Sequence, residues 1–513
     1  PIGTGRSLAA VYMLATPAAR VSDGAGSASA CISPPMLHGG SAAEAAGYGS
    51  VLTHTLTNWR THEAELASGS FARLTVVHNA RLLLPRRSHA YNWTSVAFND
   101  TFAVGEASGW WRLPTADERA ARCKQHVDGP ALVWNSWQAD YHYAHFLVNH
   151  LPMIYWLAER TPPDTRVLIG TCTWCADSLR HRTRRFLSWF DPSLAKRVSW
   201  ISMEQMTCVS GPLYVAEPTF ERARFAHPSY QTNLAAQAPY TLQSPRLLAR
   251  VSLTPMRLHA ASTEGDDAYP SVIYYSRRAP ENGNGRLFNS NHDEMLPRLI
   301  SSRMKHFNRG ERFVFFNGRQ TGEYPRPGYP MTAAQQLALF RTANLFIGPH
   351  GTAFANVLWM RPARGSEGCE THHQRLPHVI EFVCGAGSAA VREGCPYVRS
   401  YYYMLGGAAW VNWHHVLYTP RATAGVVKVD FGEVKNALDA ILKHLPPTNL
   451  PPHWSTIEGV TGPPLVSEAA VWLRRTGGGQ NESRQVDEDD DIPKNITGWT
   501  GWRQFMMLET LPN

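Results

Sequence analysis

Long hydrophobic runs, lysine and charged residues of either sign are all scarce in this sequence of 513 residues. The longest apolar stretch, Leu8 to Thr16, is about half as long as the ~18 residues that a membrane-spanning helix needs. Because the sequence opens at Pro1 and not at Met, we expect a membrane link only through an anchor that precedes this residue. Hydrophobic residues make up 43% and charged residues 18%, which excludes a wholly disordered or fibrous chain.

Arginine carries most of the positive charge. Only seven of the 49 basic residues are lysine, and the formal net charge is +8. The densest cluster, Arg180 to Arg185, has no interleaved aromatic residues and no finger motif beside it, so nucleic acid is the partner that we expect least. Scattered arginines suit a small, negatively charged substrate instead, because their charge is permanent and their N–H donors are paired.

Cysteines and glycosylation signals together predict the lumen of the secretory pathway, in the Golgi or the endoplasmic reticulum. The eight cysteines are an even number and permit complete pairing in disulfides. Four Asn-x-Ser/Thr sequons begin at Asn92, Asn99, Asn481 and Asn495. Cys172 and Cys175 have the spacing of half a zinc site, but no second ligand pair follows at a suitable distance. We expect a disulfide or buried thiols there.

Changes in composition divide the chain into four segments. At roughly 150 residues per domain, its length predicts two or three domains. Residues 1–50 are rich in Ala, Gly and Ser and predict a loose N-terminal arm. We expect an α/β domain at 51–255, a Rossmann-like domain at 256–446, and a tail with a flexible acidic linker at 447–513.

Apolar strands alternate regularly with helices in the second half of the chain. The predicted strands are 271–277, 312–318, 344–348, 378–383 and 411–418. Helices are predicted at 292–304, from 332 onward, and at 431–444. Uniformly apolar strands in this order indicate a parallel sheet covered on both faces, which is a Rossmann-like domain.

The first half is a less regular version of the same pattern. Apolar runs at 74–77 and 81–85 predict a β-hairpin around His78 and Asn79. Further strands are predicted at 131–134, 166–170, 197–202 and 213–217. A helix is predicted at 146–159, with Pro152 kinking it or delaying its start. The predicted fold class is therefore α/β, with two Rossmann-like domains facing each other across a cleft.

The most informative segment is LFIGPHGTAFANVLWM, at 345–360, where a buried strand meets a tight turn and then a helix. Such a turn exposes backbone N–H groups at the positive end of the helix dipole. Gly351 lets a phosphate approach the backbone, and His350 adds a donor. The alternative is a tight turn that merely contains a packed histidine.

A second segment brings arginines to the carboxyl end of another predicted strand. Arg277, Arg278 and Arg286 lie in a polar, glycine-rich loop that follows Ser276. Guanidinium groups suit a diphosphate because they donate hydrogen bonds in pairs. Arginines are most often surface residues, however, and that interpretation stays open here.

The third segment, DYHYAHFLVNH at 140–150, places His142, His145 and Asn149 at helical spacing after Asp140. No HExxH-type motif is present, so zinc is not expected. Several histidines beside an aspartate indicate acid–base chemistry near neutral pH, although a single histidine is more often a core residue.

These segments together resemble glycosyltransferase family 61, which includes plant core-xylosyltransferases, xylan-decorating enzymes and animal O-linked N-acetylglucosaminyltransferases. The family pattern N-Y-x-H-[FW]-L-x-[ED] corresponds to HYAHFLVN at 142–149, and S-R-x…R-x-x-N-E corresponds to SRR…RLFNSN at 276–291. An E-Q helix matches AAQQLALF at 333–340, and G-x-H-G-A-G-L-T-N matches GPHGTAFAN at 348–356. A V-I-E strand follows at 379–381.

The resemblance implies a GT-B-like architecture and an inverting glycosyltransferase. The expected donor is a UDP-sugar (UDP-xylose, UDP-N-acetylglucosamine or UDP-arabinose), and the acceptor is a hydroxyl of a glycan or glycoprotein. The domain at 51–255 would bind the acceptor and the domain at 256–446 the nucleotide sugar. Neither an obligatory cofactor nor a metal ion is expected, because arginines and backbone dipoles can stabilise the departing diphosphate.

The resemblance also implies roles for single residues. The expected donor-binding residues are Ser276, Arg277, Arg286, His350, Gly351, Thr352, Asn356 and Glu381. Asn356 is expected to fix the signature loop, and Glu381 to contact the ribose. The general base is expected to be His145, with Asp140 and His142 as competitors.

The sequence also departs from the family pattern. Asn149 stands where the family has a carboxylate, while Thr352, Ala353 and Ala355 replace Ala, Gly and Thr. The small residues should keep the turn open to phosphate. The Asn149 departure favours the alternative function, a non-catalytic binding or scaffolding module.

Overall fold

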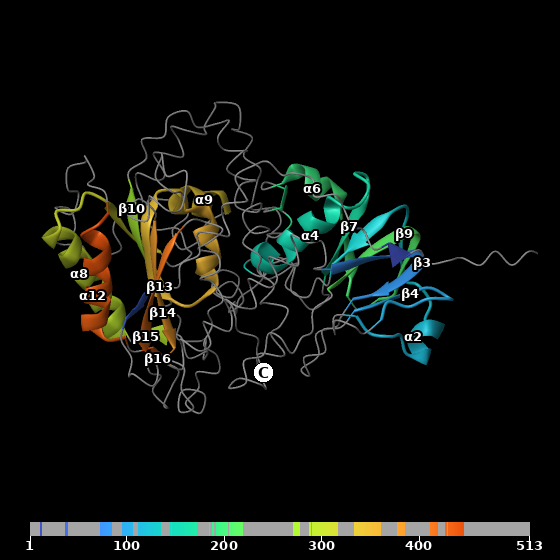
Figure 1. Cartoon of the computed structure of the whole chain (residues 1–513), viewed down its shortest axis with the longest axis horizontal. Helices are drawn as coiled ribbons and strands as arrows, with labels where there is room; N and C mark the ends of the chain where they lie inside the picture. The colour runs from blue at the N-terminus through green and yellow to red at the C-terminus, as the bar shows by residue number, and fades with distance from the viewer. Residues whose placement is uncertain are drawn as a thin grey trace, which may run out of the picture. The chain divides into compact units, whose positions relative to one another are not determined.

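We describe the fold from a computed structural model of the whole chain (Figure 1). The residues that the structure describes are 11–12, 36–38, 72–84, 95–105, 111–134, 144, 146–171, 184, 187–188, 191–203, 205–218, 270–276, 287–288, 290–316, 333–360, 377–384, 411–418, 426–427 and 429–445. No helix in these ranges is both long and apolar enough to cross a membrane.

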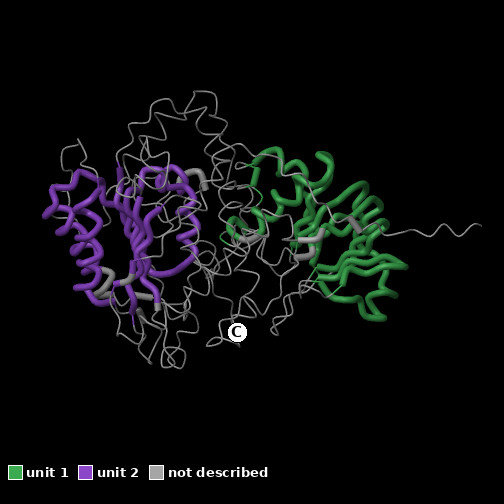
Figure 2. The backbone as a smooth tube through the Cα atoms, in the orientation of Figure 1, with its two compact units in different colours: residues 1–22, 56–251 green, residues 23–55, 252–513 purple. Residues whose placement is uncertain are grey.

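The chain divides into two compact units (Figure 2). Unit 1 comprises residues 1–22 and 56–251, and unit 2 comprises residues 23–55 and 252–513. Each unit contains a β-sheet with helices, so the predicted α/β class is confirmed. The limits proposed for the arm, the two domains and the tail stay predictions, as does the GT-B arrangement.

Unit 1 is built on a mixed sheet in which the spatial order is β1-β3-β9-β6-β7-β8, with β4 beside β3 and β5 beside β9. Its strands are β1 (Val11–Tyr12), β3 (Ala72–Leu83), β4 (Val96–Phe98), β5 (Gln125–Val127), β6 (Ala131–Val133), β7 (Arg166–Thr171), β8 (Val198–Ser202) and β9 (Thr207–Pro218). β6, β7 and β8 are parallel, whereas β3 runs antiparallel to β9. Only the parallel half resembles the regular α/β pattern expected from the sequence.

The hairpin predicted around His78 and Asn79 is wrong, because β3 continues through both residues. Asn79 adopts a positive φ of 50°, and the pairing of β3 with β9 shifts register between His78 and Ala80. Asparagine tolerates this left-handed conformation, so the interruption forms a β-bulge instead of a turn. The apolar runs on either side therefore belong to one strand of 12 residues.

The helices of unit 1 are α2 (Ala116–Ala120), η2 (Phe146–His150), α4 (Leu151–Ala158) and α6 (Pro192–Arg197). The helix predicted at 146–159 is present, but its first five residues, η2, form a π-helical turn. Pro152 lies in the first turn of α4, where its missing N–H costs no intrahelical hydrogen bond. The late start expected from Pro152 is thus confirmed.

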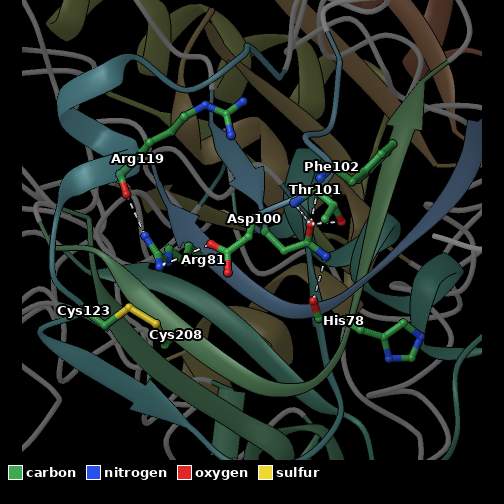
Figure 3. A network of polar contacts seen from close by, with 9 residues as sticks. His78, Arg81, Asp100, Thr101, Phe102, Arg119, Cys123 and Cys208 are labelled. Carbon is green, nitrogen blue, oxygen red and sulfur yellow. Dashed lines mark hydrogen bonds and ion pairs between the residues drawn. A yellow bond between two sulfur atoms is a disulfide. The ribbon is translucent and has the colours of Figure 1, made fainter. Parts of the chain in front are cut away.

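A disulfide joins Cys123 to Cys208 on β9, with their Cα atoms 5.6 Å apart (Figure 3). It closes a loop that spans 85 positions of the sequence, which restricts the unfolded chain and so stabilises unit 1. This is one of the disulfides that the even cysteine count permits. The segment Cys172–Cys175 lies outside the described residues.

The sequon at Asn99 forms a tight turn at the end of β4. Asn99 Oδ1 accepts hydrogen bonds from the backbone N–H groups of Thr101 (2.9 Å) and Phe102 (2.8 Å), and Asn99 Nδ2 donates to the His78 carbonyl at 3.0 Å (Figure 3). Beside it, Arg81 donates to the Arg119 carbonyl at 2.7 Å. The Asn99 side chain therefore stabilises the turn beside the β3 bulge. The other three sequons lie outside the described residues.

Unit 2 contains a six-stranded sheet in which every neighbouring pair is parallel. Its spatial order is β12-β10-β13-β14-β15-β2. The strands are β2 (Met36–His38), β10 (Ser271–Tyr275), β12 (Arg312–Phe316), β13 (Ala343–Pro349), β14 (His378–Cys384) and β15 (Asn412–Tyr418). The five strands predicted from the sequence are confirmed, and β2, from within the predicted N-terminal arm, adds an edge strand.

Helices cover both faces of this sheet. They are α8 (Ser290–His306), α9 (Ala333–Arg341), η6 (Thr352–Trp359) and α12 (Phe431–Leu442); a two-stranded sheet, β11 (Leu287–Phe288) with β16 (Val426–Val427), lies apart. Apolar residues of α8 and α12 share one buried core with β10, β13, β14 and β15. α9 lies on the opposite face, where Phe340 packs against Phe346 of β13 (Figure 1). The Rossmann-like character of this unit follows from these layers.

Three histidines, of which His378 and His414 are buried and His38 is half-buried, form a chain of hydrogen bonds on the α12 face. Asn412 Nδ2 donates to His378 Nε2 at 3.4 Å, His378 Nδ1 lies 3.2 Å from His414 Nε2, and His414 Nδ1 lies 3.2 Å from His38 Nε2. Each ring can donate with one nitrogen and accept with the other only while it is neutral. Burial lowers the pKa of His378 to about 3 and that of His414 to about 2, so both rings are neutral near pH 7.

Acidification should therefore destabilise unit 2. The pKa values of His378 and His414 are lower in the folded chain than the ordinary 6.5, so the unfolded chain binds protons first. The stability that these rings contribute is complete above pH 6.5 and is lost as the pH falls below it. Between pH 7 and pH 5 we expect a loss of about 4 kcal/mol from the pair.

Urea unfolding at a series of pH values measures this loss. His414→Leu should flatten the acid slope by about 1.4 kcal/mol per pH unit, whereas replacing the exposed His126 of unit 1 by Gln should leave it unchanged. Stability that stays constant or rises between pH 7 and pH 5 would contradict the neutral histidine chain.

Candidate functional site

The order of the strands in unit 2 reverses between β10 and β13. When the five strands of this sheet from β10 to β15 are numbered along the chain, their order in space is 2-1-3-4-5. In this numbering β10 is strand 1 and β13 is strand 3. In open parallel sheets, ligands bind outside the carboxyl ends of the two strands that flank such a reversal. Ser276 directly follows β10 and His350 directly follows β13, so two of the predicted site residues lie at this position.

The turn after β13 is short and leads directly into η6. His350 donates its backbone N–H to the Phe382 carbonyl at 3.1 Å, and Phe354 donates to the Gly351 carbonyl at 3.0 Å. Gly351 has an extended backbone, with φ 171° and ψ 177°, and η6 begins at Thr352 as a 3₁₀-helix. The first N–H groups of a helix have no acceptor within it, so this end of η6 can bind an anion.

Gly348 allows β13 to approach β10 closely just before the turn. A Cβ atom at this position would lie 2.7 Å from Tyr275 Cβ and 3.0 Å from the Tyr275 carbonyl oxygen. No larger residue fits unless the backbone of β10 moves. The close approach brings the turn after β13 beside Ser276, which is fully buried.

A buried carboxylate lies beneath the turn. Glu381 is 0% exposed, and its Oε1 lies 2.5 Å from His350 Nδ1. Its Oε2 accepts hydrogen bonds from Trp413 Nε1 and His415 Nε2, each at 3.0 Å. Burial lowers the pKa of His415 to about 3, so this ring is a neutral donor near pH 7. Glu381 lies within β14 and not at its end, and the contact with the ribose expected of it stays a prediction.

The hydroxyl of Thr352 is available to a ligand at the start of η6. Thr352 is 2% exposed, and its Oγ1 has no hydrogen-bond partner among the described residues. A buried hydroxyl without a protein partner is costly, and a bound group or a water molecule can supply the missing hydrogen bond. The Thr352 hydroxyl lies at the same end of η6 as the first backbone N–H groups of that helix.

One protein-family model matches the chain. It describes glycosyltransferase 61 and covers residues 143–366, which include the turn at His350 and the loop that follows Ser276. This stretch of the chain belongs to glycosyltransferase family 61. None of the curated proteins searched matches the sequence. Glu381, Trp413 and His415 lie beyond the matched region.

A second set of buried hydrogen bonds fixes the family 61 signature loop. Asn356 on η6 donates its amide N–H to Gln336 Oε1 of α9 at 2.9 Å, and Trp359 Nε1 donates to Asn356 Oδ1 at 3.2 Å. The geometry agrees with the loop-fixing role expected for Asn356. Gln336 occupies the glutamine position of the family's E-Q pattern, and that pattern was the signal by which its role could have been predicted.

The structure brings together the predicted residues of unit 2 that it describes. These are Ser276, His350, Gly351, Thr352, Asn356 and Glu381. Arg277, Arg286, Asp140, His142 and His145 lie outside the described residues, so their roles stay predictions. Asn149 lies in η2.

Sequence reasoning missed Trp413 and His415. Both lie in β15, more than 30 positions after Glu381, and only the register of β14 with β15 places His415 opposite Glu381. Within the described ranges no group of three or more His, Cys, Asp or Glu residues could hold a metal ion.

Gly348→Ala should destabilise unit 2 and disturb the turn. The added methyl group would meet Tyr275 at 2.7 Å, a contact that only a shift of β10 relieves. We expect a loss of about 1–3 kcal/mol in the free energy of unfolding, measured by urea titration of the full chain.

Gly105→Ala provides the matched control, because no atom of the described residues lies within 4 Å of a Cβ atom at that position. Its effect should stay within about 0.5 kcal/mol. Equal stability of the two variants would show that β10 and β13 are not as close as described.

Proposed function

We propose that this family 61 glycosyltransferase is an inverting enzyme that moves a sugar from a UDP-sugar to a hydroxyl of a glycan or glycoprotein. The observation that carries the proposal is the turn at 349–352, which lies where the strand order reverses and contains the buried Thr352 hydroxyl, for which the described residues offer no hydrogen-bond partner. A diphosphate fits both the first N–H groups of η6, which have no acceptor within the helix, and that hydroxyl.

The reaction would be a single displacement at the anomeric carbon. A base takes the proton of the acceptor hydroxyl while its oxygen forms the new bond to that carbon. The bond between the anomeric carbon and the diphosphate oxygen breaks, and its electron pair leaves with UDP. The turn at 349–352 contributes N–H donors and the Thr352 hydroxyl to the departing diphosphate, and Arg277 and Arg286 would add positive charge.

The same proposal covers the conditions of the reaction. Donor binding by N–H groups, a hydroxyl and arginines requires no metal ion, so we propose metal-independent transfer. UDP-xylose, UDP-N-acetylglucosamine and UDP-arabinose are the proposed donors. The Cys123–Cys208 disulfide supports an oxidising compartment, which we propose to be the lumen of the Golgi or the endoplasmic reticulum.

The second candidate function is a binding or scaffolding module without turnover. Asn149 supports it, because an amide replaces the carboxylate of the family pattern four positions after the predicted base His145. Against it, η2 at 146–150 is a π-helical turn, and such turns occur frequently at functional sites. Hydrolysis of UDP-xylose or UDP-N-acetylglucosamine by the full chain would favour the enzyme over the module.

Thr352→Val should weaken UDP binding without weakening the fold. Because the Thr352 hydroxyl has no partner among the described residues, its replacement by a methyl group removes no described hydrogen bond and should leave the free energy of unfolding within about 0.5 kcal/mol. Its loss should raise the Kd for UDP about tenfold, which is about 1.4 kcal/mol, measured by isothermal titration calorimetry.

Thr352→Ser is the matched control, because it keeps the hydroxyl and should bind UDP nearly as tightly as the unmodified chain. If Thr352→Val binds UDP with an unchanged Kd, the diphosphate does not lie at this turn.

His145→Ala should abolish sugar transfer and leave UDP binding almost unchanged, because a general base contacts the acceptor and not the nucleotide. Transfer is measured as UDP release in the presence of acceptor, and binding by calorimetry. Asp140→Asn and His142→Gln provide the comparison between the three candidate bases. Turnover retained by His145→Ala would reject His145 as the base.

A further inference from the structure

Glu381 and His350 form a buried pair that shares one proton. Their contacting atoms, Oε1 and Nδ1, lie 2.5 Å apart, and Glu381 is fully buried. The proton can lie on the imidazole, giving an imidazolium and a carboxylate, or on the carboxyl group, giving two neutral partners. A dry interior favours neither arrangement by itself, because charge separation costs solvation while the ion pair gains attraction. The other contacts of Glu381 therefore decide which partner carries the proton.

Those other contacts favour the carboxylate. Trp413 Nε1 can only donate, and it donates to Glu381 Oε2 at 3.0 Å. His415 Nε2 lies at the same distance from Oε2, and burial lowers the pKa of His415 to about 3, so this ring donates without carrying a charge. Together with His350, these are the contacts that the described residues make with the Glu381 carboxylate. Hydrogen bonds to the charged form of an acid stabilise that form.

The sheet holds the two donors in place. β14 and β15 are in parallel register, with Glu381 opposite His415 and Val379 opposite Trp413. His415 is 0% exposed and Trp413 is 4% exposed, and the Trp413 ring packs against Phe354 of η6 with 5.9 Å between centroids. Packing from the strand and from η6 thus fixes the direction of both N–H groups toward Oε2.

We infer that Trp413 and His415 are positioning residues, which hold the shared proton of the Glu381–His350 pair on the imidazole and so make His350 a cation. His350 lies one residue before Gly351 and two before Thr352, at the turn proposed to bind the donor diphosphate. A fixed positive charge in a buried site stabilises a developing anion more strongly than it would in water. The ligand in this inference rests on the proposed function, whereas the position of the proton does not.

The position of the proton can be measured without a ligand. In the full chain labelled with ¹⁵N-histidine, ¹H–¹⁵N spectra near pH 7 should show protons on both ring nitrogens of His350, whose signals His350→Gln identifies. In Glu381→Gln and in Trp413→Phe combined with His415→Leu, only one ring nitrogen should remain protonated. A singly protonated ring in the unmodified chain, or an unchanged ring in the double variant, would overturn the inference.

UDP binding gives the second readout. The double variant and Glu381→Gln should each raise the Kd for UDP about tenfold, whereas His415→Gln, whose amide N–H replaces the Nε2–H donor, should stay within about threefold of the unmodified chain. If His415 had only a structural role, His415→Gln and His415→Leu would bind UDP with the same Kd when the two variants are equally stable. Equal Kd values for these two variants would overturn the role of the His415 donor.

Trp111→Phe is the matched control for Trp413→Phe. Trp111 is a buried tryptophan of unit 1 that donates to the Ala216 carbonyl at 2.9 Å, so the same N–H is removed away from the site. It should change neither the His350 signals nor the Kd for UDP. If the double variant does not fold, Trp413→Phe alone replaces it in the test. We then expect a partial loss of the second proton on the His350 ring. A doubly protonated His350 in a chain that does not bind UDP would support the inference and contradict the proposed function.

Discussion

A carboxylate can be buried only where hydrogen-bond donors reach it, and the second unit brings three donors to Glu381. One comes from the turn after β13 and two come from β15, so the three strands β13, β14 and β15 have to keep their register for the contacts to form. The row Gly348–Glu381–His415 crosses these strands at the level of the turn. The charge beneath the turn and the close approach of β13 to β10 therefore depend on the same parallel pairing.

Much of unit 2 could be predicted from the sequence, because its strands are short continuous apolar runs and its signature turn is local. The turn at 348–352, the loop-fixing Asn356 and the capping of the sheet by helices all follow from residues close together in the chain. Trp413 and His415 could not be predicted in this way. Their contacts with Glu381 depend on how β15 pairs with β14, and pairing between strands more than 25 residues apart leaves no local signal.

Unit 1 shows the opposite case. The two apolar runs of β3 are separated by His78 and Asn79, residues that are as suitable for a turn as for a bulge. β3 pairs with β9 along most of its length, and this pairing produces a bulge instead of a turn. The pairing is again non-local. β2 likewise comes from a segment without periodicity and joins the sheet only through its register with β15. In both units, local chemistry was predictable and long-range pairing was not.

The central claim is that the turn between β13 and η6 binds the diphosphate of the donor. A crystal structure of the full chain with UDP bound tests it most directly. We expect the oxygens of the diphosphate within hydrogen-bond distance of the Thr352 hydroxyl and of the first N–H groups of η6, with the His350 ring beside them. UDP bound at another sheet edge, with no hydrogen bond to the Thr352 hydroxyl, would contradict the account.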